Sequence, residues 1–273
     1  MISVVISTYN AYDWLEKTLT GYEVQSFKDF EIVIADDGSN IETQKKIEDY
    51  VRSSPLMISH VWHEDNGFQK TRILNKALLV CKGEYIVMSD GDCIPRADFI
   101  EVHNNKKRPG HFLSGGYYKL PMDISQSITK YDIIDQKCFD IGWLKARGLN
   151  PSFLKTQKLA SRGFKAELLN TITPTTPSWN GHNSSGWKKD ILEINGFDDR
   201  MQYGGEDREL GERLVNAGIR PVQIRYLAIC VHLDHSRGYV NREAQEVNKM
   251  IRRETKKLKK TTTEFGIVQR GLD

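Results

Sequence analysis

Short apolar runs alternate with amphipathic segments through the first hundred residues of the chain. The apolar runs predict four strands, at residues 2–7, 30–35, 57–62 and 84–89. Between them, residues 13–21, 42–52 and 69–80 have the spacing of helices, and the last places Ile73, Ala77 and Val80 on one stripe. Strands that alternate with helices in this way are typical of βαβ units and a mostly parallel sheet. The first 120 residues therefore predict a Rossmann-like α/β half.

The second half of the chain has a less regular pattern. Residues 121–177 contain polar, helix-like pieces and end in an extended connector at 171–177. A helix is predicted at 208–217, and a single strand at 221–231 would deliver the histidines that follow it to a strand end. Because no internal repeat is visible, we expect residues 121–240 to extend the same sheet within one domain. Residues 241–273 are expected to form a basic helical tail.

Composition is that of an ordinary globular chain. Its 273 residues are 39% hydrophobic, which allows a sizeable core, and no apolar run approaches the roughly 18 to 20 residues of a membrane-spanning helix. The start of the chain lacks the basic region and cleavage site of a signal peptide, so we expect a cytosolic protein. The four cysteines have no paired spacing and are expected to be reduced and mostly buried: Cys81, Cys93, Cys138 and Cys230.

The net charge of +3 comes from 39 basic and 36 acidic side chains and gives no reason to expect nucleic-acid binding. Basic residues are nevertheless concentrated at 249–260, in a helix-like stretch that begins near Asn241 and in which Val247, Ile251 and Leu258 supply only a thin apolar stripe. Two interpretations remain open for this segment. It is either a solvated helix face or a surface that makes a peripheral contact with an anionic membrane leaflet.

Two acidic residues flank a glycine directly after the fourth predicted strand. Asp90 and Asp92, separated by Gly91, can face a divalent cation and a ribose with no side chain between them. Open α/β sheets bind ligands at this end of their strands. A turn stabilised by an Asp side chain and ended by Pro95 is the structural alternative.

Two histidines follow the last predicted strand. If His232 and His235 both reach one ion, their imidazole nitrogens favour manganese over magnesium at that site. Arg237 next to them would either balance a diphosphate by bidentate hydrogen bonding or form a surface salt bridge.

An acidic pair on a glycine turn completes the chemistry-bearing residues. Gly204 and Gly205 let the backbone approach a ligand and place Glu206 and Asp207 at the start of a predicted helix. Asp207 is then either a helix N-cap or a general base that removes a proton from an attacking hydroxyl. Together with the carboxylates and imidazoles at strand ends, the pair favours metal-assisted sugar transfer from a nucleotide.

The chain resembles family 2 glycosyltransferases of the GT-A fold over most of residues 1–240. Four segments of the first half follow that family's order and spacing: residues 7–10 (STYN), 36–39 (DDGS), 66–72 (NGFQKTR) and 90–92 (DGD). Three segments of the second half resemble the carboxyl-terminal part of β-1,4-galactosyltransferases and chondroitin-polymerase-like enzymes: residues 195–198 (NGFD), 204–207 (GGED) and 235–237 (HSR). The resemblance implies a mixed central sheet, with residues 1–120 binding the nucleotide and 121–240 the acceptor.

For the donor, the resemblance implies a nucleotide sugar, with a UDP-sugar preferred. Asp37 would accept the uracil N–H, and Asp90 would bind the ribose. Thr8, Tyr9 and Arg72 would hold the nucleoside and phosphates. The segment around Arg72 departs from the family because it lacks the common Ala-Arg-Asn ending.

For the reaction, the resemblance implies an inverting single displacement with Mn²⁺ or Mg²⁺ as cofactor. Asp92, His235 and His232 would hold the metal. Asp207 would be the general base, and Glu206 would hold the acceptor.

A further segment sits where related enzymes contact the acceptor or donor sugar. The resemblance points to Trp179, Asn180, His182 and Gly205 for such contacts. Trp179 and Trp187 would either stack on a sugar ring or belong to the core.

The predicted function is therefore transfer of a hexose or N-acetylhexosamine to a saccharide hydroxyl with formation of a β-glycosidic bond. The acceptor would be an oligosaccharide or a lipid-linked saccharide, and the resemblance implies a role in bacterial surface polysaccharide or lipopolysaccharide synthesis, on the cytoplasmic face of the inner membrane. Two alternatives come from other classes. A sugar-phosphate nucleotidyltransferase would need a glycine-rich basic loop after its first strand, which residues 7–10 do not supply, and a non-catalytic nucleotide- or carbohydrate-binding module would bind without transfer.

Overall fold

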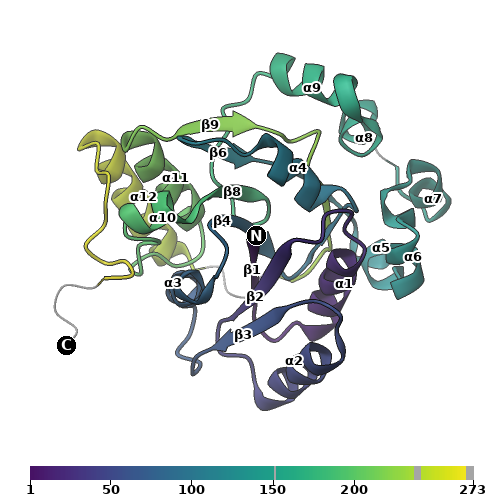
Figure 1. Ribbon diagram of the computed structural model, residues 1–273, viewed down its shortest axis with the longest axis horizontal. Coiled ribbons are helices and arrows are strands. Elements are labelled where there is room, and N and C mark those ends of the chain that lie inside the picture. The colour runs from purple at the N-terminus through teal and green to yellow at the C-terminus, as the bar shows by residue number, and fades with distance from the viewer. Residues whose placement is uncertain (151, 237–240, 269–273) are drawn as a thin grey trace.

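The computed structural model describes residues 1–150, 152–236 and 241–268. A seven-stranded sheet of order β3-β2-β1-β4-β8-β6-β9 forms the centre, and a three-stranded sheet of order β5-β10-β7 lies beside it (Figure 1). The large sheet contains β1 (Ile2–Thr8), β2 (Phe30–Asp36), β3 (Ile58–Trp62), β4 (Tyr85–Asp90), β6 (His111–Ser114), β8 (Ser184–Trp187) and β9 (Arg220–Gln223). The small sheet contains β5 (Cys93–Pro95), β7 (Gly116–Lys119) and β10 (Ile229–His232).

The first half is the predicted parallel unit. β1 pairs in parallel with both β2 and β4, and β3 continues from β2. The connecting helices fall close to the predicted ranges: α1 (Tyr12–Glu23), α2 (Ile41–Ser53) and α3 (Lys70–Val80). Because these helices cover both faces of the sheet, β1 is apolar on both sides, as is usual in parallel sheets.

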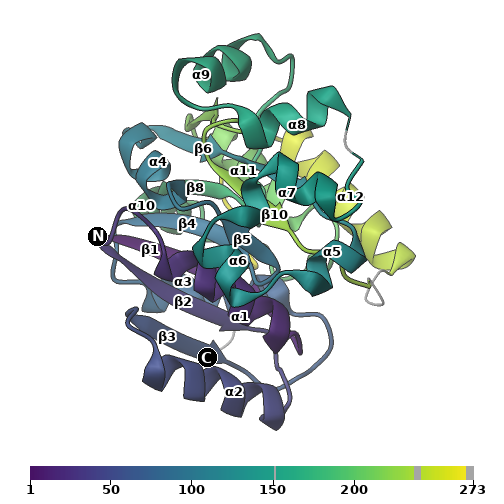
Figure 2. The same cartoon turned by 90° about the vertical axis from the view of Figure 1, so that its right-hand side faces the viewer.

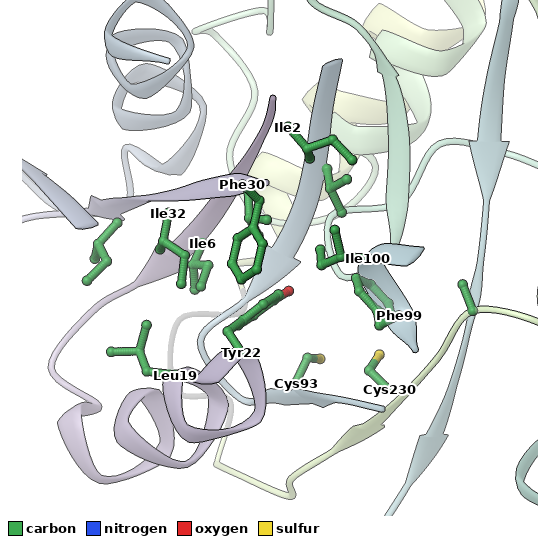
Figure 3. Packing of buried hydrophobic residues seen from close by; sticks show 14 of the residues in the cluster. Ile2, Ile6, Leu19, Tyr22, Phe30, Ile32, Cys93, Phe99, Ile100 and Cys230 are labelled. Carbon is green, nitrogen blue, oxygen red and sulfur yellow. The ribbon is translucent and has the colours of Figure 1, made fainter. Parts of the chain in front are cut away.

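Side chains of β1 alternate between two cores. Ile2 and Ile6 pack on one face against Leu19 and Tyr22 of α1 and Phe30 of β2 (Figure 3). Val5, which directly precedes Ile6, packs on the opposite face with residues of α3. This alternation fixes the register of the strand, since a slip of one residue would exchange the two faces.

The second half makes the central sheet mixed, as expected. β8 runs antiparallel to both β4 and β6, while β9 runs parallel to β6. The prediction of a single strand at 221–231 is wrong. Backbone N–H groups of Leu227 and Ala228 donate to the carbonyl of Ile224, so the chain turns there, leaves β9 and enters β10 in the other sheet.

Short helices fill the stretch that the sequence pattern left irregular. They are α5 (Met122–Ser127), α6 (Lys130–Ile134), α7 (Ile141–Ala146), α8 (Phe153–Ala160) and α9 (Gly163–Ile172), with a 3₁₀ turn at Lys137–Phe139. Figure 2 shows α5 to α8 gathered beside β5 and β10, where Ile124, Ile133 and Leu144 build a third core on the small sheet. The remaining helices of the sheet layers are α4 (Phe99–Lys106) and α10 (Lys188–Glu193).

The carboxyl-terminal helices are α11 (Glu206–Asn216) and α12 (Arg242–Lys257). Arg252 of α12 forms a salt bridge with Glu212 of α11, and the side-chain amide of Asn248 donates to the carbonyls of Gln202 and Gly204. The predicted basic helix therefore exists, and it supports the loop before α11. All four cysteines are buried free thiols, as expected. Among the described residues, no helix has the length and apolar character needed to span a bilayer.

Candidate active site

Several strands end at one edge of the fold, and the candidate residues stand there. β2 ends at Asp36 and β4 at Asp90, while β10 ends at His232. The Gly91 N–H donates to the carbonyl of Ser7, which ties the end of β4 to the end of β1. The motifs that lie far apart in the sequence therefore meet where ligands bind to α/β sheets.

Asp37 is held by two donors from the β3–α3 segment. His63 Nε2 lies 2.9 Å from Asp37 Oδ1, and the Gln69 N–H donates to Oδ2 over 3.0 Å. Burial raises the pKa of Asp37, while His63 and the Gln69 N–H offset part of the rise. Each oxygen has a second lone pair for a ligand N–H. A carboxylate fixed in this way is suited to accept a hydrogen bond from a base edge.

The other expected donor contacts are spread around Asp37. Thr8 is buried, and its Oγ1 has no hydrogen-bond partner in the described part of the chain. Tyr9 is about half exposed and donates its hydroxyl to Asp65. Arg72 lines a surface pocket together with His63, and its Nε lies 3.7 Å from Asp199 Oδ2. Arg72 is thus on the Asp37 side of the site.

Asp90 is paired with a lysine that sequence reasoning did not select. Lys70 Nζ and Ser7 Oγ each donate to Asp90 Oδ1 over 2.8 Å. Burial alone would raise the pKa of Asp90, but Lys70, His182 and the hydrogen bonds outweigh it and hold the pKa well below its usual range. Asp90 is therefore ionised at neutral pH. Lys70 begins α3, and only the fold places it beside the strand end.

Asp92, His232 and His235 form a cluster whose ligand atoms all lie within 4.8 Å of one another. Asp92 Oδ2 is 3.0 Å from His235 Nε2 and 3.6 Å from His232 Nε2. The two imidazole rings stack with centroids 5.5 Å apart. One carboxylate and two imidazoles suit a transition metal such as Mn²⁺, so the residues present fit the expected metal.

The glycine turn before α11 has the geometry that its sequence predicts. Gly204 and Gly205 have φ of +112° and +107°, a region that favours glycine. A Cβ on Gly205 would also approach the Arg252 side chain to 3.0 Å. The turn is held further by the Gly204 N–H, which donates to Glu206 Oε2 over 2.8 Å.

Asp207 lies in the first turn of α11 rather than at its N-cap, which is Gly205. Burial raises the pKa of Asp207 to about 7, and the Glu206 and Asp90 carboxylates add to the rise, while Lys70 and the Gly181 N–H oppose it. Asp207 Oδ1 is buried without a hydrogen-bond partner among the described residues. A carboxylate with a pKa near neutrality and one unpaired oxygen has the properties of a general base.

Trp179 belongs to the core, which is one of the two interpretations that the sequence left open, and its full burial excludes a stacking contact with a sugar. Its side chain is fully buried and packs on Phe112, with ring centroids 5.6 Å apart. Gly186 and Gly211 make room for it, since a Cβ at either position would come within 3.0 Å of Trp179. Trp187 donates its indole N–H to the Arg108 carbonyl and packs on Tyr85, away from the site.

The loop that Trp179 anchors enters the site. Its Gly181 contacts Asp207, where an added Cβ would lie 2.8 Å from Oδ2. Burial lowers the pKa of His182 to about 4, so its imidazole is neutral at pH 7, and it packs edge-on against Tyr117. Asn180 instead holds the loop together, because its side-chain oxygen accepts the Asn183 N–H.

Three residues of the site were not selected as candidates from the sequence: Lys70, His63 and Tyr117, whose ring also lies 5.7 Å from that of His232. Each is recognised only through a partner from another element. Their position in the sequence is a signal for two of them, since His63 directly follows β3 and Lys70 is the first residue of the next helix, α3. Arg237, expected near the diphosphate, lies outside the described residues.

Two family models match separate parts of the chain. Residues 3–111 match the model of glycosyl transferase family 2, and residues 174–236 match the model described as the N-terminal domain of galactosyltransferase. The resemblance inferred from the motifs is confirmed by these matches.

Two curated relatives are similar over most of the chain. An uncharacterized glycosyltransferase, YfnE of Bacillus subtilis (strain 168), is 25% identical over 85% of this chain and 64% of its own length. The chondroitin synthase of Escherichia coli is 27% identical over 80% of this chain and 32% of its own length. The chain thus spans less than two thirds of these relatives.

Solved structures share the fold. A mannosyltransferase from Pyrobaculum calidifontis, in complex with GDP-mannose and Mn²⁺, has a TM-score of 0.59 at 20% identity, covering 87% of this chain and 58% of its own. The structure of S. aureus TarS 1–349 in complex with UDP-GlcNAc has a TM-score of 0.57 at 16% identity, and the match covers 92% of this chain and 65% of the TarS chain. The predicted GT-A fold is confirmed.

Proposed function

Because residues 3–111 match the model of glycosyl transferase family 2, we propose that the protein is an inverting, metal-dependent glycosyltransferase. It would move a hexose or N-acetylhexosamine from a UDP-sugar to a saccharide hydroxyl and form a β-glycosidic bond. The observation that carries the proposal is the position of Asp207. Burial raises the pKa of this carboxyl group to about 7, and the charges of Lys70 and Asp90 also act on it. Lys70 and Asp90 form a hydrogen-bonded pair at the end of β4, two residues before Asp92.

The donor side of the proposed site comprises the residues around β1, β2 and β4. Asp37 would accept the base N–H, and Asp90 would bind the ribose, while Thr8, Tyr9 and Arg72 would contact the nucleoside and phosphates. The fixed orientation of Asp37 between His63 and Gln69 supports its role. Two structural neighbours hold GDP-mannose or UDP-GlcNAc, which supports a nucleotide sugar as donor.

The reaction side comprises the metal cluster and the acidic pair. A metal held by Asp92, His232 and His235 would supply positive charge to the departing diphosphate. The acceptor oxygen attacks the anomeric carbon, the bond from that carbon to the diphosphate oxygen breaks, and the hydroxyl proton passes to Asp207 Oδ1. This single displacement inverts the anomeric centre. Glu206, fixed by the Gly204 N–H, would orient the acceptor.

Several wider assignments belong to the same proposal. Residues 1–120 would bind the donor, residues 121–240 would bind the acceptor, and residues 241–273 would form a basic tail. Asn180, His182 and Gly205 would lie near the transferred sugar or its acceptor. An oligosaccharide or lipid-linked acceptor in bacterial surface polysaccharide or lipopolysaccharide synthesis, on the cytoplasmic face of the inner membrane, agrees with the chondroitin synthase likeness. Neither family model that matches the chain describes a nucleotidyltransferase.

A nucleotide panel tests the proposal directly. We expect UDP to raise the melting temperature of the protein more than GDP, CMP or dTDP, and to do so only with Mn²⁺, because a ligand that binds the folded state stabilises it. Incubation with UDP-sugars should then release UDP. Stabilisation by UDP without release or transfer across a wide set of acceptors would favour the binding module, and no response to any nucleotide would contradict the proposal.

A further inference from the structure

Helix α9 (Gly163–Ile172) presents an apolar face to solvent. Phe164, Leu168 and Ile172 recur at intervals of four and lie on one stripe of the helix. Their side chains are 81%, 47% and 60% exposed, whereas Ala166 on another face is buried. Figure 1 shows α8 and α9 at the periphery, outside the sheet layers. Three large apolar side chains on one exposed stripe indicate an interaction surface.

The segment that carries this stripe is basic. Residues 152–172 contain four basic residues and one acidic residue, while the whole chain has an excess of only three positive charges. The acidic residue, Glu167, is paired with Lys106 of α4. Lys155 and Lys165 are exposed and form no salt bridge with any described residue. The surface of α8 and α9 is therefore apolar and positively charged.

From this combination we propose that the α9 face binds an anionic lipid bilayer. Helices that lie in a bilayer interface insert an apolar stripe between the headgroups and place lysines against anionic phosphates. A symmetric dimer through the same face would bring the basic segments of two copies together, and the repulsion between their positive charges is unfavourable. Anionic lipid complements both the apolar stripe and its charge.

The α9 surface differs from the basic helix α12, which the sequence alone suggested as a membrane contact. Arg252 and Lys256 of α12 both pair with Glu212, and Lys249 pairs with Glu246. Arg242, Arg253 and Lys257 of α12 form no salt bridge with a described residue, so charge does not separate the two helices. They differ in exposed apolar surface, because α12 exposes two large apolar side chains, Val247 and Met250, whereas α9 exposes three on one stripe.

The proposed contact would also orient the active site. Helix α8 packs beside β7, and Lys158 Nζ donates to the Tyr117 carbonyl over 3.1 Å. The Tyr117 ring in turn contacts His182 and His232. A bilayer on α9 would therefore lie near the side of the site proposed for the acceptor. This step alone rests on the proposed function, since it assumes a lipid-linked acceptor.

Co-sedimentation of the full chain with vesicles tests the contact. We expect binding to vesicles of phosphatidylcholine with phosphatidylglycerol, weak binding to phosphatidylcholine alone, and loss of binding at high salt. The triple variant Phe164→Ser, Leu168→Ser, Ile172→Ser should lower the fraction bound about 10-fold, and Lys155→Glu with Lys165→Glu should abolish the preference for anionic lipid. The matched control, Val247→Ser with Met250→Ser, removes two exposed apolar side chains from α12 and should bind like the unmodified chain.

Other occupants of the face give different results. A triple variant that binds vesicles normally, or an α12 variant that loses binding, would overturn the proposal. Sedimentation velocity that shows a dimer in the unmodified chain and a monomer in the triple variant would assign the face to a second copy instead. A cooperative thermal transition at the melting temperature of the unmodified chain checks that each variant is folded. If vesicles bind but UDP does not, the proposed function fails while the lipid contact stands.

Discussion

The two sides of the proposed site differ in how fully their carboxylates are paired. On the donor side, Asp36 pairs with His60, Asp37 with His63 and the Gln69 N–H, and Asp90 with Lys70. On the reaction side, Asp207 Oδ1 and His232 Nδ1 are buried without partners among the described residues. Buried polar atoms are rarely left unpaired. The donor-side carboxylates are therefore stabilised by their partners, whereas Asp207 keeps one oxygen in a state that costs stability.

This difference has a consequence for the effects of mutations. Removing a partner of Asp37 or Asp90, the two carboxylates proposed to bind the nucleoside, should weaken both folding and nucleotide affinity, because the carboxylate is left without that hydrogen bond. Removing Asp207 should harm turnover alone, and it should not weaken the fold. Comparing stability with turnover therefore separates the two sides.

The largest effect is expected for Asp207→Asn. Loss of a general base should lower kcat at least about 100-fold with UDP affinity unchanged. Its folded-state pKa is raised to about 7, so the ionised carboxylate contributes a penalty that appears as pH rises towards 7. The Asn variant should therefore melt at the same temperature or higher at pH 8. Asp190→Asn is the matched control, since Asp190 is also buried with an unpaired oxygen but lies on α10. Near-normal transfer by Asp207→Asn would exclude this residue as the base.

The next effect is expected for His235→Ala, which removes one of three proposed metal ligands. The Mn²⁺ concentration that gives half of the UDP-dependent rise in melting temperature should increase by about 10-fold or more. His111→Ala, in β6, is the control and should leave the titration unchanged. A variant that titrates like the unmodified protein would count against ligation by His235.

A smaller effect is expected at Lys70, which joins the two sides. The rate should fall as pH drops below about 7, because Asp207 must be deprotonated to act as a base. Lys70→Met removes an ammonium that lowers the pKa of Asp207, so the acid limb of the pH–rate profile should move to higher pH and cost about 10-fold in rate at pH 6. Lys70→Arg keeps the charge and should restore the original profile. If the acid limb of the pH–rate profile of Lys70→Met stays where it is in the unmodified protein, Lys70 interacts with Asp90 but does not lower the pKa of Asp207.

Much of the donor side could be predicted because its signals are local. A strand followed by a polar turn is read from neighbouring residues, so the ends of β2 and β4 were placed correctly together with Asp37 and Asp90. The partners of these carboxylates could not be predicted. Lys70 and His63 meet them only after the strands have paired, and sequence periodicity carries no information about that contact.

The reaction side was harder to predict because it depends on contacts between distant segments. The apolar character of 221–231 hides the turn that separates β9 from β10. The burial of Trp179 depends on Gly186 and Gly211, whose missing side chains create its space. An exposed sugar-stacking tryptophan and a buried anchor look alike in sequence, and only the packing distinguishes them.

The smallest effect is expected for His63→Ala, and it tests whether pairing on the donor side contributes to binding. The variant removes the 2.9 Å hydrogen bond to Asp37 Oδ1 and leaves only the Gln69 N–H to orient the carboxylate. Loss of one such bond costs about 1 kcal/mol, so the Kd for UDP should rise about 5-fold while kcat stays the same. His60→Ala breaks the corresponding bond to the neighbouring Asp36 and should lower the melting temperature without changing the Kd. Equal affinities in the two variants would mean that Asp37 is not oriented for the base, and the donor-side assignment would have to move to the pocket lined by Arg72.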